Sequence, residues 1–167
     1  IIPRIIGTDL AITVDNGISA IHAASLCEEQ GIDLVITDHH QPPSILPEAV
    51  AVINPQRQDS EFPFRPLAGV GVAFFLLIAL RKTLRESGWF GERPEPDLRD
   101  YLDLVALGTI ADLVPLLGVN RTMARHGLRL IENGPRIGLR ALKQVASVKN
   151  VTSGVVGFQL APRLNAA

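Results

Sequence analysis

Three short apolar runs near the start of the chain each end at polar or turn-forming residues. They are Leu10–Val14 before Asp15-Asn16-Gly17, Leu34–Thr37 before Asp38-His39-His40, and Ala49–Ile53 before Asn54-Pro55. Runs of this length, rich in β-branched residues and bounded by turn signals, are typical of buried strands. Between the first two, Ser19–Gln30 carries helix formers, and Gly31 follows where a helix C-cap belongs. This pattern predicts an α/β fold with a parallel sheet and flanking helices on both faces.

The pattern becomes helical beyond a polar, proline-containing loop at 56–68. Helices are predicted over Val70–Ser87, from an Asp97 cap to about Ile110, from an Asn120 cap to about Glu132, and over Ile137–Val148. Residues 151–167 show no clear periodicity. The predicted outline is therefore a sheet followed by a helical layer.

Composition narrows the class of protein. Apolar residues make up 47% of the 167 and charged residues 20%, which fits a globular domain and excludes a disordered chain. The single cysteine, Cys27, excludes disulfide scaffolds and cysteine-based zinc sites, and fits a reducing compartment. The longest nearly uncharged stretch, Gly69–Leu80, is too short to span a bilayer. We expect a cytoplasmic protein without membrane contact, and its oligomeric state stays open.

The net charge of −1 conceals an uneven distribution. Residues 1–118 carry eight basic and sixteen acidic side chains, a net −8, whereas residues 119–167 carry eight basic and one acidic, a net +7. An acidic body with a basic surface that meets phosphates would explain this asymmetry, and so would two solvated faces that happen to differ.

Ionisable residues follow the first two predicted strands directly. Ligands of open parallel sheets collect at the carboxyl ends of the strands, so Asp15 and Asp38-His39-His40 would share one edge if these strands are neighbours. Carboxylate and imidazole groups together suit Mn²⁺, Mg²⁺, Fe²⁺ or Zn²⁺. Asp15 alone could be a turn residue, but three adjacent ionisable groups after a buried strand favour a metal or phosphate role. Asp112, the one acid in an apolar stretch, needs a cation, an arginine or helix-end donors as its partner.

These residues lie in segments that resemble the ordered motifs of the DHH phosphoesterase superfamily. The segments are TVDNG at 13–17, ITDHH at 36–40 and ALGTIADLVPL at 106–116. Three further segments resemble the RecJ-like branch, exonucleases that degrade single-stranded DNA from 5′ to 3′: LAGVGVAF at 67–74, GVNR at 118–121 and GFQLAPRLNAA at 157–167. The resemblance covers essentially the whole chain.

The resemblance implies a role for each matching residue. Asp15 would bridge two divalent ions, Mn²⁺ or Mg²⁺, and His39 and Asp112 would bind one of them. His40 would face the scissile phosphate, and Asp38 would orient its neighbours; these two are the catalytic candidates. In the intact enzyme the two ions would hold a phosphodiester and activate a water for in-line attack.

Candidate substrate-binding residues come from the basic end of the chain. Arg163 and Asn165 fall where the family places groups close to the substrate. Arg121, Arg125 and Arg129 are spaced by four, so they form one stripe on a helix, and Arg136, Arg140 and Lys143 would extend it. A solvated helix face explains that stripe at least as well as contact with DNA.

The family's first motif, an earlier strand with two aspartates, has no counterpart here, because Asp9 is the only acid before Asp15. The glycine- and histidine-rich motif of the family's second domain has none either. We therefore expect an internal piece of a nuclease, a DHH domain incomplete at its N-terminus and weak or inactive alone. Its parts would be a sheet portion at 1–55, a mainly helical portion at 56–150, and the start of a connection to a second domain at 151–167.

The sequence thus predicts part of a metal-dependent exonuclease of DNA repair and recombination that acts on single-stranded DNA. Two alternatives stay open. One is a DHH enzyme that hydrolyses oligonucleotides, cyclic dinucleotides or pyrophosphate, which would have less need of a +7 surface. The other is a non-catalytic DNA-binding relative, against which the presence of Asp15, His39 and Asp112 argues.

Overall fold

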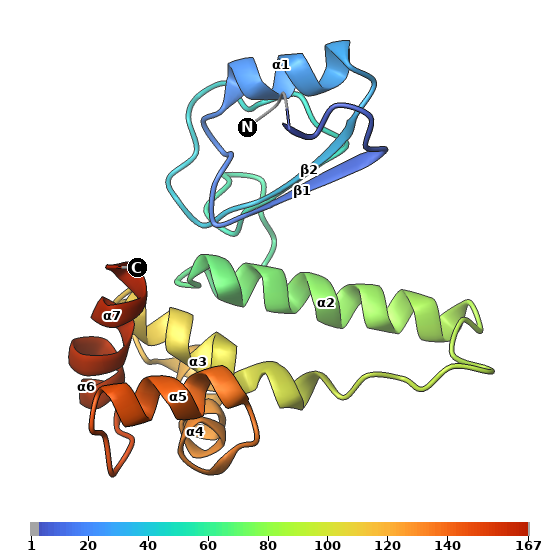
Figure 1. Cartoon of the computed structure of the whole chain (residues 1–167). Coiled ribbons are helices and arrows are strands. Elements are labelled where there is room, and N and C mark those ends of the chain that lie inside the picture. Colours follow the sequence, from blue (N-terminus) through green and yellow to red (C-terminus); the bar gives the residue numbers. More distant parts are fainter. Residues whose placement is uncertain (1–3, 167) are drawn as a thin grey trace. The chain divides into compact units, whose positions relative to one another are not determined.

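The first two predicted strands are neighbours in a parallel sheet. In the computed structural model, which describes residues 4–166, the sheet has the order β1-β2-β3. Figure 1 labels β1 and β2 side by side. Its strands are β1 Leu10–Val14, β2 Asp33–Thr37 and β3 Ala51–Ile53. The register pairs Val14 with Thr37 and Thr37 with Ile53, so all three strands end at one edge. The predicted α/β class is therefore confirmed, although β3 begins two residues later than expected.

One helix covers one face of this sheet. Helix α1, Ile21–Glu29, lies over β1 and β2 (Figure 1) and places Ala24 and Cys27 against Leu34 and Ile36. Side chains alternate along a strand, so Leu10, Ile12 and Val14 share the opposite face of β1, and each stays about half exposed. The predicted parallel sheet with flanking helices is confirmed, but the full burial of both strand faces is not seen at β1 within the described residues.

The chain divides into two compact units, with the boundary between Ala73 and Phe74. Helix α2, Gly69–Glu86, begins in the first unit. The second unit contains η2 Leu98–Tyr101, α3 Leu102–Ala111, α4 Gly118–Asn133, α5 Ile137–Val145, α6 Ser153–Val155, the π-helical turn η3 Val156–Leu160, and α7 Ala161–Asn165.

The second unit is built around α3 and α4. The two helices approach closely at Gly127, where a methyl group would collide with the carbonyl of Leu102 and with Ala106. Val156 and Leu160, both fully buried, complete the core on the side of α3. Close backbone approach of this kind requires glycine, which explains a glycine in the middle of an otherwise regular helix.

Several predicted helix ends need correction. Asp97 does cap η2, since its carboxylate accepts a hydrogen bond from the Arg99 amide at 3.0 Å. Asn120 is not a cap: α4 already begins at Gly118, and the buried Asn120 amide donates to the Pro115 carbonyl at 3.0 Å. The segment read as aperiodic, 151–166, is mostly helical. Its π-helical turn departs from the regular helical period, which hides the pattern; Ala167 lies outside the described residues.

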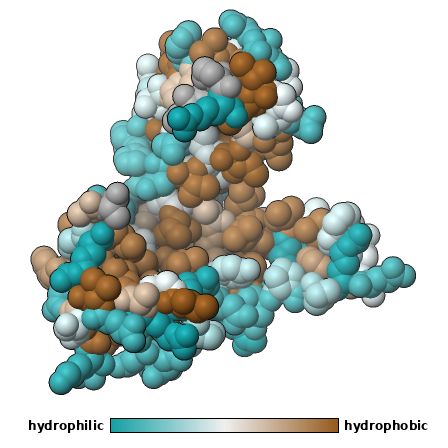
Figure 2. Space-filling view, viewed as in Figure 1, coloured by the Kyte–Doolittle hydropathy of each residue, from teal (hydrophilic) through white to brown (hydrophobic). Residues whose placement is uncertain are grey.

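Apolar side chains also reach the surface. Leu77, Ile78 and Leu80 on α2 are partly exposed, and hydrophobic atoms are visible along this helix in Figure 2. None of the helices within residues 4–166 has both the length and the apolar character that a bilayer-spanning helix needs.

Candidate metal centre

The turn after β1 fixes the direction of Asp15. This residue has a left-handed backbone, with φ of 65°, a conformation that aspartate tolerates better than most residues. Its amide donates to the Thr37 carbonyl at 3.0 Å, which ties the turn to β2. The Thr13 hydroxyl donates to the backbone carbonyl of Asn16 at 2.7 Å. The side-chain amide of Asn16 donates to the backbone carbonyl of Val14 at 3.0 Å. Strained residues held by a surrounding network of this kind cluster at functional sites.

The loop after β2 is organised by Asp38, whose side chain is 1% exposed. Its Oδ1 accepts hydrogen bonds from the His39 amide at 2.8 Å, the His40 amide at 3.2 Å and the His40 ring Nδ1 at 2.7 Å. Its Oδ2 accepts a bond from the Ile18 amide at 2.9 Å. One buried carboxylate therefore joins the turn that carries Asp15 to the loop that carries both histidines.

These hydrogen bonds keep Asp38 ionised. Burial by itself raises the pKa of the Asp38 carboxyl, but the bonds from the Ile18 amide, the His40 ring and the two histidine amides outweigh it. The net effect lowers the pKa below its ordinary value. An ionised carboxylate can only accept, so Nδ1 of His40 must carry the proton that it donates. Asp38 thus sets the tautomer and the orientation of the His40 ring.

Asp15, His39 and His40 converge on one point. Each offers a ligand atom, and these atoms all lie within 4.8 Å of one another. The Asp15 Oδ1 is 3.1 Å from the His39 Nε2, and the two imidazole rings are 4.4 Å apart between centroids. Atoms bound to one ion at about 2.2 Å lie up to about 4.4 Å apart, so small side-chain movements would bring the three around a divalent ion. Their carboxylate and imidazole donors fit Mn²⁺, Fe²⁺ or Zn²⁺, and Mg²⁺ through the carboxylate.

The structure thus brings together three of the predicted site residues, and it places Asp38 beneath them as their support. Within residues 4–166 no other group of metal-ligating side chains meets the same criterion. Asp112 belongs to the second unit, where it is the C-cap of α3 and is followed by the left-handed Leu113. Its role as a ligand stays a prediction.

The predicted substrate-side residues also lie in the second unit. Arg121, Arg125 and Arg129 are exposed on α4 and have no ion-pair partner among the described residues. Arg163 and Asn165 are exposed on α7, where the Arg163 guanidinium donates to the Gln159 carbonyl at 2.6 Å.

Two residues expected to extend the basic surface are engaged elsewhere. The Arg136 guanidinium binds the buried Asp103 carboxylate at 2.6 and 3.1 Å. The Lys143 ammonium donates to the Glu132 carbonyl at 2.6 Å. Arg140 remains exposed. The stripe on α4 is therefore a better candidate for phosphate contact than its predicted extension.

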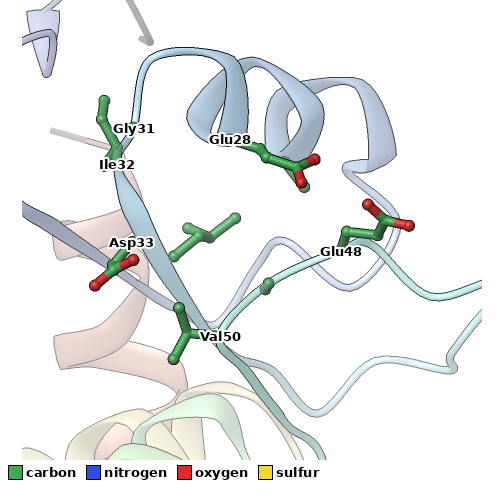
Figure 3. Close-up of a pocket in the computed structure, with 9 residues that line it drawn as sticks. Glu28, Gly31, Ile32, Asp33, Glu48 and Val50 are labelled. Atoms are coloured by element: carbon green, nitrogen blue, oxygen red, sulfur yellow. The ribbon is translucent and has the colours of Figure 1, made fainter.

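A hollow of about 410 Å³ opens near the start of β2, at the opposite end of the strand from the metal cluster. Its lining includes Glu28 on α1, Glu48 and Asp33, and Figure 3 shows the Asp33 carboxylate apart from the two glutamates. Carboxylates without a basic side chain in the lining repel a phosphodiester. The hollow is therefore not a phosphate site.

Comparison with known proteins agrees with this geometry. Residues 1–109 match the model of the DHH family, N-terminal domain. The chain belongs to the DHH family. The match includes both the turn at Asp15 and the loop at Asp38-His39-His40.

Relatives of this DHH chain carry more specific names. It is 51% identical over 166 residues to the single-stranded-DNA-specific exonuclease RecJ of Dickeya dadantii, a match that covers 96% of this chain and 29% of the relative. A crystal structure of exonuclease RecJ bound to manganese superposes with a TM-score of 0.82 at 36% identity, covering 99% of this chain and 40% of that one. RecJ of Thermus thermophilus in complex with Mn²⁺ gives a TM-score of 0.81, also at 36% identity, and covers 99% and 24%. The chain thus spans less than a third of the length of the curated relative.

Sequence reasoning missed the residues that hold the cluster in place. Thr37 is fully buried, and its hydroxyl donates to the Thr13 carbonyl at 2.7 Å. Gly69 is buried against Asp15. A threonine at or next to the end of each of the first two strands is a visible signal, but the sequence does not show which carbonyl a hydroxyl will reach.

Proposed function

We propose that this chain forms the metal-binding part of a metal-dependent exonuclease that hydrolyses single-stranded DNA from its 5′ end, in DNA repair and recombination. The observation that carries the proposal is the convergence of Asp15, His39 and His40 at the carboxyl edge of the sheet. Similarity to RecJ exonucleases over nearly the whole chain supports the choice of reaction and substrate. The manganese in related RecJ structures supports Mn²⁺ as a cofactor, with Mg²⁺ as the other choice.

The carboxylate and imidazole groups of the cluster identify the residues that would bind the metal ions. Asp15 and His39 would hold a divalent ion, with Asp112 as a further ligand, and Asp15 would bridge to a second ion in the intact protein. Such ions hold a phosphodiester and lower the pKa of a bound water so that it can attack. Within the DHH domain, the sheet portion at 1–55 supplies Asp15 and His39, and the helical portion at 56–150 supplies Asp112. Residues 151–167 would begin the connection to a second domain.

His40 is suited to meet the scissile phosphate. Asp38 holds the proton on Nδ1, so Nε2 is the ring nitrogen that we assign to a substrate oxygen. A protonated Nε2 would donate to a non-bridging phosphate oxygen and stabilise the negative charge that develops there.

The arginine stripe on α4 would hold the DNA strand. Arg121, Arg125 and Arg129 are not neutralised by ion pairs among the described residues, so their charge is available to phosphates. Arg163 and Asn165 on α7 would contact the substrate nearer to the metals. We further propose a cytoplasmic location, which the single buried thiol of Cys27 favours.

The test is the substitution Asp15→Ala. It is made in the full natural polypeptide that contains this sequence, which we call the intact protein. We expect loss of Mn²⁺-dependent cleavage by more than about 100-fold, because even supporting residues cost 10- to 100-fold when removed from metal sites. The matched control is Asp33→Ala, which removes an exposed carboxylate at the opposite end of β2. Cleavage by Asp15→Ala at the control's rate would refute the proposed site.

A substrate panel tests the reaction itself. Single strands labelled at the 5′ end should release labelled mononucleotide first, whereas dinucleotides, cyclic dinucleotides and pyrophosphate should react slowly. Faster hydrolysis of the small substrates would instead favour a small-molecule DHH phosphoesterase. DNA binding without any hydrolysis would favour a non-catalytic relative.

A further inference from the structure

Gly69 lies directly against Asp15. It is the first residue of α2 and is buried within the first unit. A methyl group built on Gly69 would lie 2.5 Å from both the Cβ and the Cγ of Asp15, and closer still to its Oδ1. Real Cβ atoms essentially never show contacts below 3.0 Å, so no side chain fits here while Asp15 keeps its place.

Neither partner in this contact can move easily. Leu67 and Ala68, which precede Gly69, are 2% and 1% exposed, so the start of α2 is anchored in the core. The backbone of Asp15 is held in its left-handed conformation by the bond from its amide to the Thr37 carbonyl. The Cβ of Asp15 moves only with that backbone, so a change of side-chain rotamer alone cannot relieve the collision.

We propose that Gly69 is a positioning residue for the metal centre: its missing side chain leaves the space in which Asp15 can face His39. The proposal rests on the proposed function, in which Asp15 and His39 bind the ion. Any side chain at position 69 would displace the Asp15 carboxylate from the His39 Nε2, which now lies 3.1 Å from it. The exposed side of Asp15, whose side chain is 55% accessible, is the direction in which it would yield.

The chain offers a matched control two residues further along α2. Gly71 is also buried in the first turn of α2, but a methyl group there would come only as close as 3.4 Å, to the side chain of Leu67. That distance is ordinary van der Waals contact. Gly69→Ala and Gly71→Ala therefore make the same chemical change in the first turn of α2, and they differ in the collision with Asp15.

The experiment measures Mn²⁺ binding to the intact protein from the loss of the electron paramagnetic resonance signal of free Mn²⁺. Gly69→Ala should weaken binding about 10- to 100-fold, the range typical for residues that orient a ligand, and Gly71→Ala should leave it unchanged. Asp15→Ala is measured alongside. If Asp15→Ala abolishes binding and Gly69→Ala does not weaken it, the positioning role is wrong and the metal site stands. If Asp15→Ala binds Mn²⁺ normally, the proposed metal site itself is wrong.

A second measurement covers the case in which Gly69→Ala folds poorly. In an Asp15→Gly background the Cβ and carboxylate that collide with the new methyl group are gone. Gly69→Ala should then lower the melting temperature much less than it does in the parent protein. Equal losses in both backgrounds would show that the methyl group meets something other than Asp15, and would overturn the proposal.

Discussion

Replacing Asp38 with asparagine tests whether one buried carboxylate organises both turns of the metal centre. Asparagine has nearly the same shape, but it offers only one acceptor oxygen and turns the other end into a donor. If that oxygen takes the place of Oδ1, it keeps the three bonds from His39 and His40. The amide NH₂ group then faces the Ile18 N–H, which is also a donor.

The cost can be estimated from these contacts. Ile18 is 2% exposed, so its unpaired amide cannot turn to water, and a buried unsatisfied group costs about 1–3 kcal/mol. The bonds that remain also lose their charge assistance, about 1 kcal/mol for the strongest. A neutral amide is less costly to bury than a carboxylate, which offsets part of this. After that offset, we expect Asp38→Asn to lower the free energy of unfolding by about 1–3 kcal/mol.

Urea denaturation followed by circular dichroism measures this loss, as a lower midpoint with an unchanged m value. The exposed Asp33 supplies the control, because Asp33→Asn should stay within about 0.5 kcal/mol of the parent. Hydrogen exchange adds a local readout, since the Ile18 amide should lose its protection in Asp38→Asn. An unchanged midpoint together with a protected Ile18 amide would refute the reasoning.

The acid dependence of stability gives an independent check on the same residue. The pKa of Asp38 is lower in the folded protein than its ordinary value of 3.8, so the unfolded state binds the proton more readily. Its contribution to stability is complete well above pH 3.8 and is lost as the pH falls through the lowered pKa. Asp38→Asn should therefore flatten that part of the stability profile, whereas Asp33→Asn should retain it.

Three further predictions concern the second unit. Asp103→Ala removes the buried hydrogen-bonding partner of Arg136, whose side chain is 34% exposed, and should lower the free energy of unfolding by about 1–3 kcal/mol. A melting temperature within a degree of the parent's would contradict this. The pKa of Asp97 is lowered from 3.8 to about 2 by the side-chain and backbone hydrogen bonds of Arg99. An NMR titration should find it there, and the stability it provides should be present above pH 3.8 and lost toward pH 2. Arg125→Ala should weaken binding of single-stranded DNA about equally for all sequences and reduce the salt dependence of log K by about 0.7, which an unchanged slope would disprove.

The sequence predicts the edge of the sheet better than it predicts the helices. Strand ends are marked by abrupt changes from apolar to charged residues, so the positions of Asp15 and Asp38 relative to the strands could be predicted. The start of α4 could not, because Asn120 resembles a cap while its buried side chain in fact binds the Pro115 carbonyl. That hydrogen bond depends on the geometry of the turn between Pro115 and Asn120, which the local sequence pattern does not predict.

The candidate site, too, could be predicted in its ligand residues and not in the residues that support them. The residue types and their places after two neighbouring strands predicted that Asp15 and His39 would meet, and their atoms lie 3.1 Å apart. The support from Asp38, Thr37 and Gly69 could not be predicted in detail, because hydrogen-bond partners and close approaches are set by tertiary packing. The sequence indicates that Asp38 orients its neighbours, and the structure adds the Ile18 amide as the link to the other turn.

Strands β1 and β2 end at paired residues, and this register limits where residues can be inserted into the sequence or deleted from it. Val14 pairs with Thr37, so the residues that follow both strands emerge together. Deleting or inserting a single residue in β2 would turn every later side chain to the opposite side and carry Asp38 out of the interior. The connection at 41–49 lies before the first backbone bond of the next strand to β2, from the Val50 amide to the Leu34 carbonyl, and longer insertions there add little entropy cost. Natural length variation among close homologues should accordingly gather in that connection and spare both strands.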